Sequence, residues 1–139
     1  MRIDIRTIPH SDQRYLTSGD WFWSEDETVL NIRISHMRNS RHEFCLSLHE
    51  LVEAMLCWFG GVPQSAADEF DMPYETDHAA GKARYHCGCP RKEFSDPGSD
   101  IHAPYHWQHR IADVVERTVA AILKIDWEAY DREVDDPTK

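Results

Sequence analysis

The residues of this chain most suited to chemistry lie in the segment His49–Glu53 (HELVE), inside the apolar run from Phe44 to Phe59. If the segment is helical, His49 and Glu53 lie one turn apart on the same face, a spacing at which two side chains can bind one metal ion. Glu50 then lies beside them and is free of the metal. Because ionisable groups are costly to bury unless they are paired or metal-bound, the segment predicts a metal site with an additional carboxylate.

This segment resembles the HExxH active-site helix of the zincin metallopeptidases, as an HExxE variant in which Glu53 replaces the second His. In that family two ligands at i and i+4 hold zinc, and the Glu after the first ligand is the general base that acts on the zinc-bound water. The resemblance implies that His49 and Glu53 are metal ligands and that Glu50 is catalytic. It also implies a zincin-like fold and a hydrolase that acts on a peptide or related bond. Glu53 makes the site harder and more negative, so Mn or Fe is an alternative to Zn.

A catalytic zinc needs a third protein ligand and an open position for water. His106 and His109 lie three residues apart at the start of a second expected helix, and Asp113 and Glu116 continue their face. Either His could complete the site, with His106 slightly favoured because the first turn of a helix can reach sideways into a cleft. Against this, their face lies opposite the apolar face, as a solvated face would. The loop before this helix offers alternative ligands, which are His78, His86, His102, Cys87 and Cys89.

A structural interpretation competes with the catalytic one. The helix that carries His49 has a narrow line of residues that could be its solvated edge, with no metal bound; the line comprises His42, Leu46, His49, Glu53 and Cys57. A closed metal site that only holds the two helices together is another alternative, and Glu50 would then have no water to act on. Both alternatives remain open from the sequence.

The composition limits the class of protein. The chain has 139 residues and 41% hydrophobic residues, which predicts one globular domain over residues 1–139. Its formal net charge of −10 argues against direct binding of nucleic acid through phosphates, although an acidic chain can imitate DNA. Residues 1–10 contain no apolar segment of a signal peptide, and no stretch approaches the length of a membrane span. We therefore expect a cytoplasmic protein that does not contact a membrane.

Periodicity predicts the elements that must position these residues. Residues 2–6 and 28–34 alternate with the period of a strand, and an aromatic segment at 21–23 completes an expected hairpin over residues 20–35. The period becomes helical from residue 39 to residue 59, where Gly60 and Gly61 end the helix. The order of a strand followed by this helix is similar to that of zincins.

The second half is predicted as a short helix from Pro63 to Phe70, a long loop at about residues 71–103, and a second long helix with Pro104 at its first position. We therefore expect an α+β fold with a small antiparallel sheet of about three strands, followed by two long helices. The second long helix has an expected apolar face that consists of Trp107, Ile111, Val114, Val115, Thr118, Ile122 and Ile125.

The combination of a small acidic chain, an LHELVEA helix, a Pro-Gly loop and a PYHxxH helix looks like small proteins found in bacteriophage and bacterial genomes. Two functions follow as expectations. The first is a zincin-like metal-dependent hydrolase with a peptide or small-molecule substrate. The alternative is a non-enzymatic acidic phage-type protein that binds or inhibits a host protein, with a structural metal site or none. An enzyme would concentrate its carboxylates with His at a concavity, whereas a DNA mimic would spread them over a broad surface.

Overall fold

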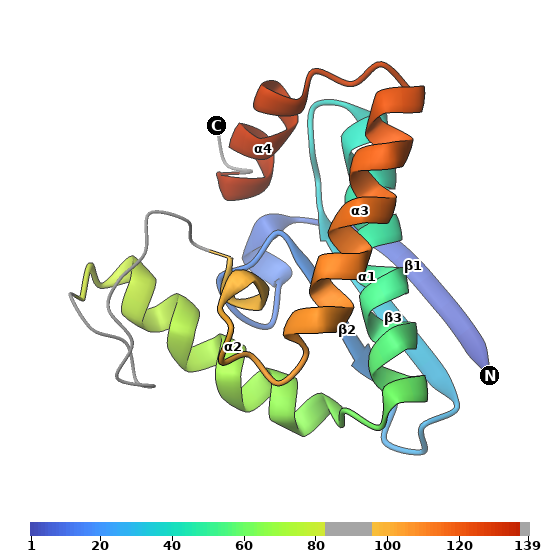
Figure 1. Ribbon diagram of the computed structural model, residues 1–139, viewed down its shortest axis with the longest axis vertical. Coiled ribbons are helices and arrows are strands. Elements are labelled where there is room, and N and C mark those ends of the chain that lie inside the picture. The colour runs from blue at the N-terminus through green and yellow to red at the C-terminus, as the bar shows by residue number, and fades with distance from the viewer. Residues whose placement is uncertain (83–95, 137–139) are drawn as a thin grey trace.

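The computed structural model describes residues 1–82 and 96–136, which form a three-stranded sheet and helices that pack beside it (Figure 1). The strands are β1 (Arg2–Ile8), β2 (Gly19–Trp23) and β3 (Val29–Ser35), in the order β1-β3-β2. The fold is therefore α+β, as predicted. The expected hairpin is also present, because β2 and β3 are antiparallel neighbours.

The sheet is mixed, so the prediction of an antiparallel sheet is wrong for β1. This strand runs parallel to β3, with Ile3 opposite Leu30 and Ile5 opposite Ile32. Alternating side chains specify which face of a strand is buried, but they do not specify the direction of its neighbour. The chain leaves β1 through a short 3-10 turn at His10–Asp12 and returns on the far side of β3, which places β3 in the centre.

Helix α1 (Ser40–Gly60) carries the HELVE segment and has both ends fixed by local chemistry. The Asn39 side chain accepts a hydrogen bond from the backbone N–H of Arg41 at 3.0 Å, which caps the first turn. Gly61 adopts a left-handed conformation with φ of 73°, and its N–H bonds back to the last turn of the helix. These boundaries agree with the sequence-based prediction.

Helix α2 (Gln64–Ala79) is longer than predicted, and the expected loop at residues 71–103 is wrong over its first part. Pro73 lies inside the helix, where its ring removes a backbone hydrogen bond. Burial of Ala67 and Tyr74 on the same helix offsets this cost, since tertiary packing overrides local propensity. A 3-10 turn, η2 (Pro97–Ser99), interrupts the same segment further along the chain.

Helix α3 (His106–Ile122) lies beside α1 in the opposite direction, and α4 (Trp127–Asp135) follows it (Figure 1). Arg41 at the start of α1 bonds the carbonyl of Leu123 beyond the end of α3. Pro104 precedes the helix instead of occupying its first position. The described residues thus form four α-helices, of which α1 and α3 correspond to the two long helices expected. None of them combines the length and the apolar composition that crossing a bilayer requires.

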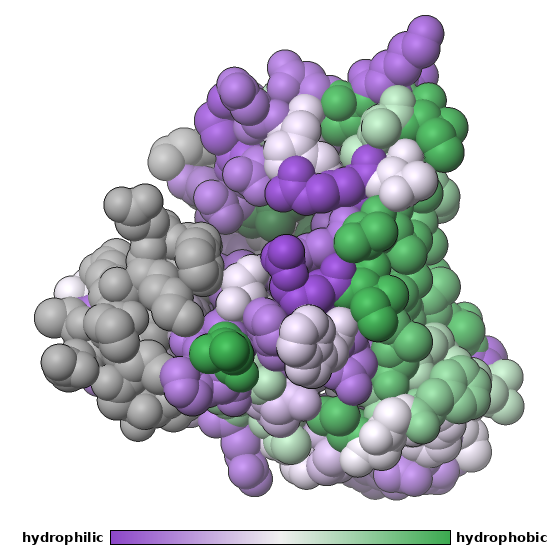
Figure 2. Space-filling view, viewed as in Figure 1, coloured by the Kyte–Doolittle hydropathy of each residue, from purple (hydrophilic) through white to green (hydrophobic). Residues whose placement is uncertain are grey.

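The two central helices turn their polar residues inward. On α1 the interpretation as a solvated edge is wrong, because His49 and Glu53 are each only 6% exposed. On α3 the buried side chains include His109 and Glu116, and the predicted apolar face is largely exposed instead (Figure 2). Its most exposed members are Trp107, Ile111, Val114 and Ile122. The sheet side of the core is apolar and includes Leu30, Ile32 and Ile34, all fully buried.

Candidate metal site

Three possible metal ligands converge where α1 faces α3. The ring nitrogen Nε2 of His49 lies 3.5 Å from Oε2 of Glu53 and 3.1 Å from Nδ1 of His109. Nδ1 of His109 in turn lies 2.8 Å from Oε2 of Glu53. In a tetrahedral zinc site with bonds of about 2.0–2.1 Å, the ligand atoms are about 3.3 Å apart. The three distances are close to that value, so these atoms fit around one ion.

The opposite nitrogen of His49 is held by a chain of hydrogen bonds that ends on α4. Nδ1 of His49 lies 3.1 Å from Oε2 of Glu116, and Oε1 of Glu116 accepts a hydrogen bond from the hydroxyl of Tyr130. A metal-binding imidazole commonly donates its second N–H to a carboxylate, which fixes both the tautomer and the ring orientation. Glu116 can perform this role for His49, and Tyr130 holds Glu116.

The other two ligands are oriented in the same way. Oε1 of Glu53 accepts a hydrogen bond of 2.9 Å from the indole N–H of Trp21, which leaves Oε2 facing the imidazoles. Nε2 of His109 lies 2.6 Å from Oδ2 of Asp96, a short contact whose geometry is not aligned for a hydrogen bond. Each ligand thus has one atom turned to the shared centre and another in contact with a neighbour.

The carboxylates around the site favour positive charge at its centre. Burial lowers the pKa of His109, but Asp96 and Glu53 outweigh it and raise the pKa to about 10. Burial likewise lowers the pKa of His49, whereas Glu116 and Glu53 raise it well above its ordinary value. Because Nε2 of His49 and Nδ1 of His109 are only 3.1 Å apart, both cannot carry a proton without a clash of hydrogens. A divalent cation resolves this conflict, since both nitrogens then offer lone pairs.

Glu50 lies on α1 next to the three ligands but is not one of them. Burial raises the pKa of its carboxyl well above the ordinary value, and Glu53 raises it further, while His49 and His109 act in the opposite direction. A Cβ at Gly19 on β2 would come within 2.3 Å of Oε1 of Glu50, so only glycine leaves room for this side chain. No hydrogen bond to the Glu50 carboxyl is found among the described residues. It is thus a carboxylate next to the site, without a fixed partner there.

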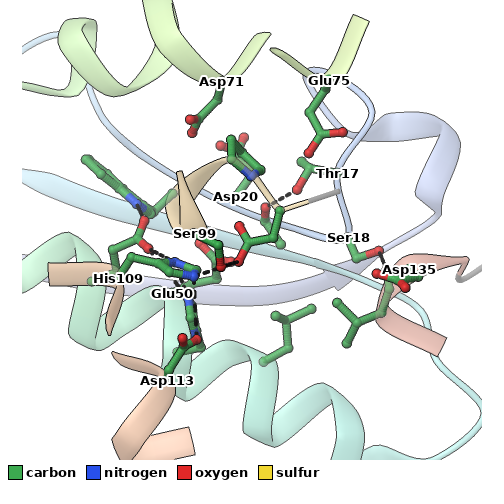
Figure 3. A pocket seen from close by; sticks show the side chains of 18 of the residues that line it. Thr17, Ser18, Asp20, Glu50, Asp71, Glu75, Ser99, His109, Asp113 and Asp135 are labelled. Carbon is green, nitrogen blue, oxygen red and sulfur yellow. Dashed lines mark hydrogen bonds and ion pairs between the residues drawn. The ribbon is translucent and has the colours of Figure 1, made fainter. Parts of the chain in front are cut away.

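The site opens into a cavity of about 880 Å³ between α2, α3 and the loop before β2 (Figure 3). The wall includes His49, Glu50, Glu53 and His109, so the three possible ligands face a space that can hold water or substrate. Figure 3 shows Glu50 and His109 close together on one side of this space, with Asp71 and Glu75 projecting from the opposite helix. A catalytic metal site requires such an open position, and a closed structural site lacks it.

The structure separates the ligands proposed from the sequence. His109 joins His49 and Glu53, whereas Nδ1 of His106 bonds the carbonyl of Gly98 at 3.0 Å and lies outside the group. His102 is bonded to Asp100 at 2.9 Å and is largely exposed. His78 lines the cavity but belongs to neither group of possible ligands among the described residues. His86, Cys87 and Cys89 lie outside the described residues.

Several site residues were not recognised as such from the sequence. The sequence places Asp113 and Glu116 on the helical face of His109 without assigning them a role, yet with His49 they form a second group whose ligand atoms lie within 4.8 Å of one another. Gly98 is a further example, because a Cβ there would come within 2.4 Å of the His109 ring. The spacing of His109, Asp113 and Glu116 places them on one helical face. It predicts their shared site only if that face is assumed to be buried. The other missed residues are Gly19, Asp96 and Tyr130.

The chain matches no known protein family, no curated protein and no solved structure. The chemistry of the site therefore carries the functional argument.

Proposed function

We propose that the protein is a zincin-like metal-dependent hydrolase that cleaves a peptide or related bond. His49, Glu53 and His109 would hold the ion, and Glu50 would act as general base. The observation that carries this proposal is the triangle of ligand atoms, with separations of 2.8, 3.1 and 3.5 Å, at the wall of an open cavity.

The ligand set favours zinc but is also compatible with other metal ions. Two imidazole nitrogens and one carboxylate oxygen with an open fourth position form the donor set of many catalytic zinc sites. The carboxylate of Glu53 is also acceptable to Mn or Fe, whose sites use harder oxygen ligands. An ion held here would polarise the carbonyl of a substrate and lower the pKa of water in the cavity.

The protein's own contribution to the reaction comes from Glu50 and from the groups that orient the ligands. Glu50 is one residue from His49 and points toward the same cavity, so its carboxylate can accept a proton from attacking water and return it to the leaving group. The dipositive charge of a bound ion would favour the ionised form of Glu50, opposing the effect of burial. Trp21 and Tyr105, which also line the cavity, would shield the reaction from bulk water.

The alternative proposed from the sequence, an acidic binding or inhibitor protein, predicts carboxylates spread over a broad surface. Among the described residues, twelve Asp and Glu side chains line the cavity, against two arginines, Arg110 and Arg117. This concentration of carboxylates with His at a concavity supports the hydrolase proposal. It also favours neutral or basic substrates over acidic ones.

The test uses the chain purified without an affinity tag. Metal analysis of the wild type should give about one transition-metal ion per chain, and incubation with denatured casein should give cleavage products that a chelator suppresses. Glu50→Gln keeps the size of the side chain but removes the base. It should retain the metal and lose at least about 100-fold in cleavage rate, the usual contribution of general base catalysis.

Three outcomes would contradict the proposal. A wild type that binds no transition metal after incubation with zinc, manganese or iron would remove the metal site. Equal cleavage by Glu50→Gln and wild type would make the site structural. Loss of the metal from Glu50→Gln would make Glu50 a ligand in place of the general base. Asp12→Asn, an exposed carboxylate outside the cavity, controls for loss of one charge.

A further inference from the structure

An apolar face extends over three neighbouring elements on one side of the molecule. Figure 2 shows hydrophobic side chains gathered along α3 and α1. On β1, Ile3 and Ile5 lie opposite Leu30 and Ile32, so they share the face of the sheet on which α1 packs. The exposed apolar residues of this face are Ile3, Ile5, Phe44, Phe59, Trp107, Ile111, Val114 and Ile122, called here the outer apolar face.

The outer apolar face is too large to be an ordinary monomer surface. Trp107 is 75% exposed, Phe59 is 77% exposed and Ile122 is 73% exposed. Together the eight residues expose roughly 900 Å² of apolar surface, on a scale where one aromatic side chain presents about 150–250 Å². The largest apolar patch of a typical monomer is about 300–600 Å², whereas each partner in a stable protein complex buries about 800 Å².

We infer that the outer apolar face binds a second copy of this chain, so that the protein is a two-fold symmetric dimer. Its area is what one side of such an interface needs. Along α3 the exposed positions of this face are Trp107, Ile111, Val114 and Ile122, with no charged side chain among them. A symmetric interface opposes each patch to an identical one, and an uncharged apolar patch is complementary to itself even though the chain has a net charge of −10.

This interface leaves the proposed catalytic site accessible. Asp113, Arg110 and Arg117 on α3 line the cavity, whereas Ile111 and Val114 of the same helix do not. The two surfaces therefore lie on different sides of α3. The inference does not depend on the proposed function, because a dimer would form whether or not the cavity holds a metal.

The experiment is sedimentation equilibrium of the untagged chain over a wide range of concentrations. The wild type should have the mass of two chains of 16.2 kDa. Ile111→Glu, at a site 51% exposed, should raise the dimer dissociation constant by more than about 100-fold, since a symmetric interface buries the new carboxylate twice. Leu16→Glu is the matched control, because Leu16 is 58% exposed and lies outside the outer apolar face. It should leave the dimer intact.

Three results would overturn the inference: a monomeric wild type, an Ile111→Glu variant that still dimerises like the wild type, or a Leu16→Glu variant that becomes monomeric. Circular dichroism checks that each variant is folded. If Ile111→Glu loses helical signal, Trp107→Glu replaces it, because Trp107 is more exposed and its substitution disturbs less packing. Ile5→Glu tests β1 separately and should also weaken the dimer.

Discussion

Nε2 of His49 lies 3.1 Å from Nδ1 of His109, although the two residues are 60 positions apart in the chain. The contact exists because α1 and α3 run in opposite directions with their polar residues facing each other. Together with the buried carboxylate of Glu53, these two imidazoles form a group that can hold a metal ion.

The first prediction separates His109 from His106. His109→Ala removes a nitrogen of the ligand triangle and should weaken zinc affinity by more than about 100-fold, since the loss of a group behind a ligand costs only about 10–100-fold. His106→Ala removes only a bond to the carbonyl of Gly98 and should change the affinity by less than about tenfold. Competition with a chromophoric chelator measures both. Equal losses in the two variants would contradict this assignment.

The second prediction concerns Gly98, whose place on η2 leaves no room for a side chain. A Cβ in Gly98→Ala would come within 2.4 Å of Cγ and Nδ1 of His109, so the imidazole must shift. Zinc affinity should fall by at least about tenfold, in the range seen when the support of a ligand is lost. Gly60→Ala is the matched control, because its Cβ would meet only the flexible end of Gln108 at 3.2 Å. An unchanged zinc affinity in Gly98→Ala would show that His109 is not held in this position.

Gly19→Ala tests the role of Glu50 separately from metal binding. Its Cβ would come within 2.3 Å of Oε1 of Glu50, which is not a ligand in the proposed site. Metal content should therefore remain unchanged while the rate of casein cleavage falls. Loss of metal from this variant would link Glu50 directly to the ion.

The sequence indicated α1 and its ligand pair because the relevant signals are local. Asn39 and Gly61 terminate the helix, and the spacing of His49 and Glu53 places them on one face whatever the helix packs against. The hairpin of β2 and β3 was equally local. These parts required no knowledge of distant contacts.

The features of the fold that were predicted wrongly from the sequence depend on contacts between distant segments. The apolar face of α3 was expected to face inward, since burial of apolar surface usually decides the orientation of a helix. The opposite orientation allows His109 and Glu116 to meet His49 across the two helices. The parallel pairing of β1 and the extension of α2 past Pro73 are likewise set by tertiary packing.

The third prediction tests the hydrogen-bond chain behind His49. Glu116→Gln retains one acceptor oxygen but no longer provides a carboxylate for both His49 and Tyr130. Zinc affinity should decrease by about 10–100-fold, as it does when a carboxylate behind a metal-binding imidazole is lost. Tyr130→Phe removes only the hydroxyl that bonds Glu116 and should have a smaller effect of the same sign. If Tyr130→Phe were to cost more affinity than Glu116→Gln, Glu116 would not be the group that orients His49.

The last prediction concerns Glu75, on the wall of the cavity away from the ligand triangle. Burial, together with the negative charges of Asp96 and Asp135, raises the pKa of its carboxyl from 4.5 to about 8. The folded protein therefore binds a proton that the unfolded chain releases between pH 4.5 and pH 8. This group's contribution to stability is complete below pH 4.5 and is lost as the pH rises through that window.

Glu75→Gln keeps a neutral group at this position and should remove that part of the pH dependence. The stability gained by the substitution, which is the free energy of unfolding of the variant minus that of the wild type, should be larger at pH 8 than at pH 5 by on the order of 1–2 kcal/mol. This value is smaller than the full pKa shift implies, because Glu75 is partly in contact with water in the cavity. Urea unfolding in the presence of a chelator at the two pH values measures this difference without the contribution of bound metal. Glu69→Gln, which removes a negative charge from the exposed side of the same helix, is the control. The same pH dependence in Glu75→Gln and wild type would contradict the raised pKa of Glu75.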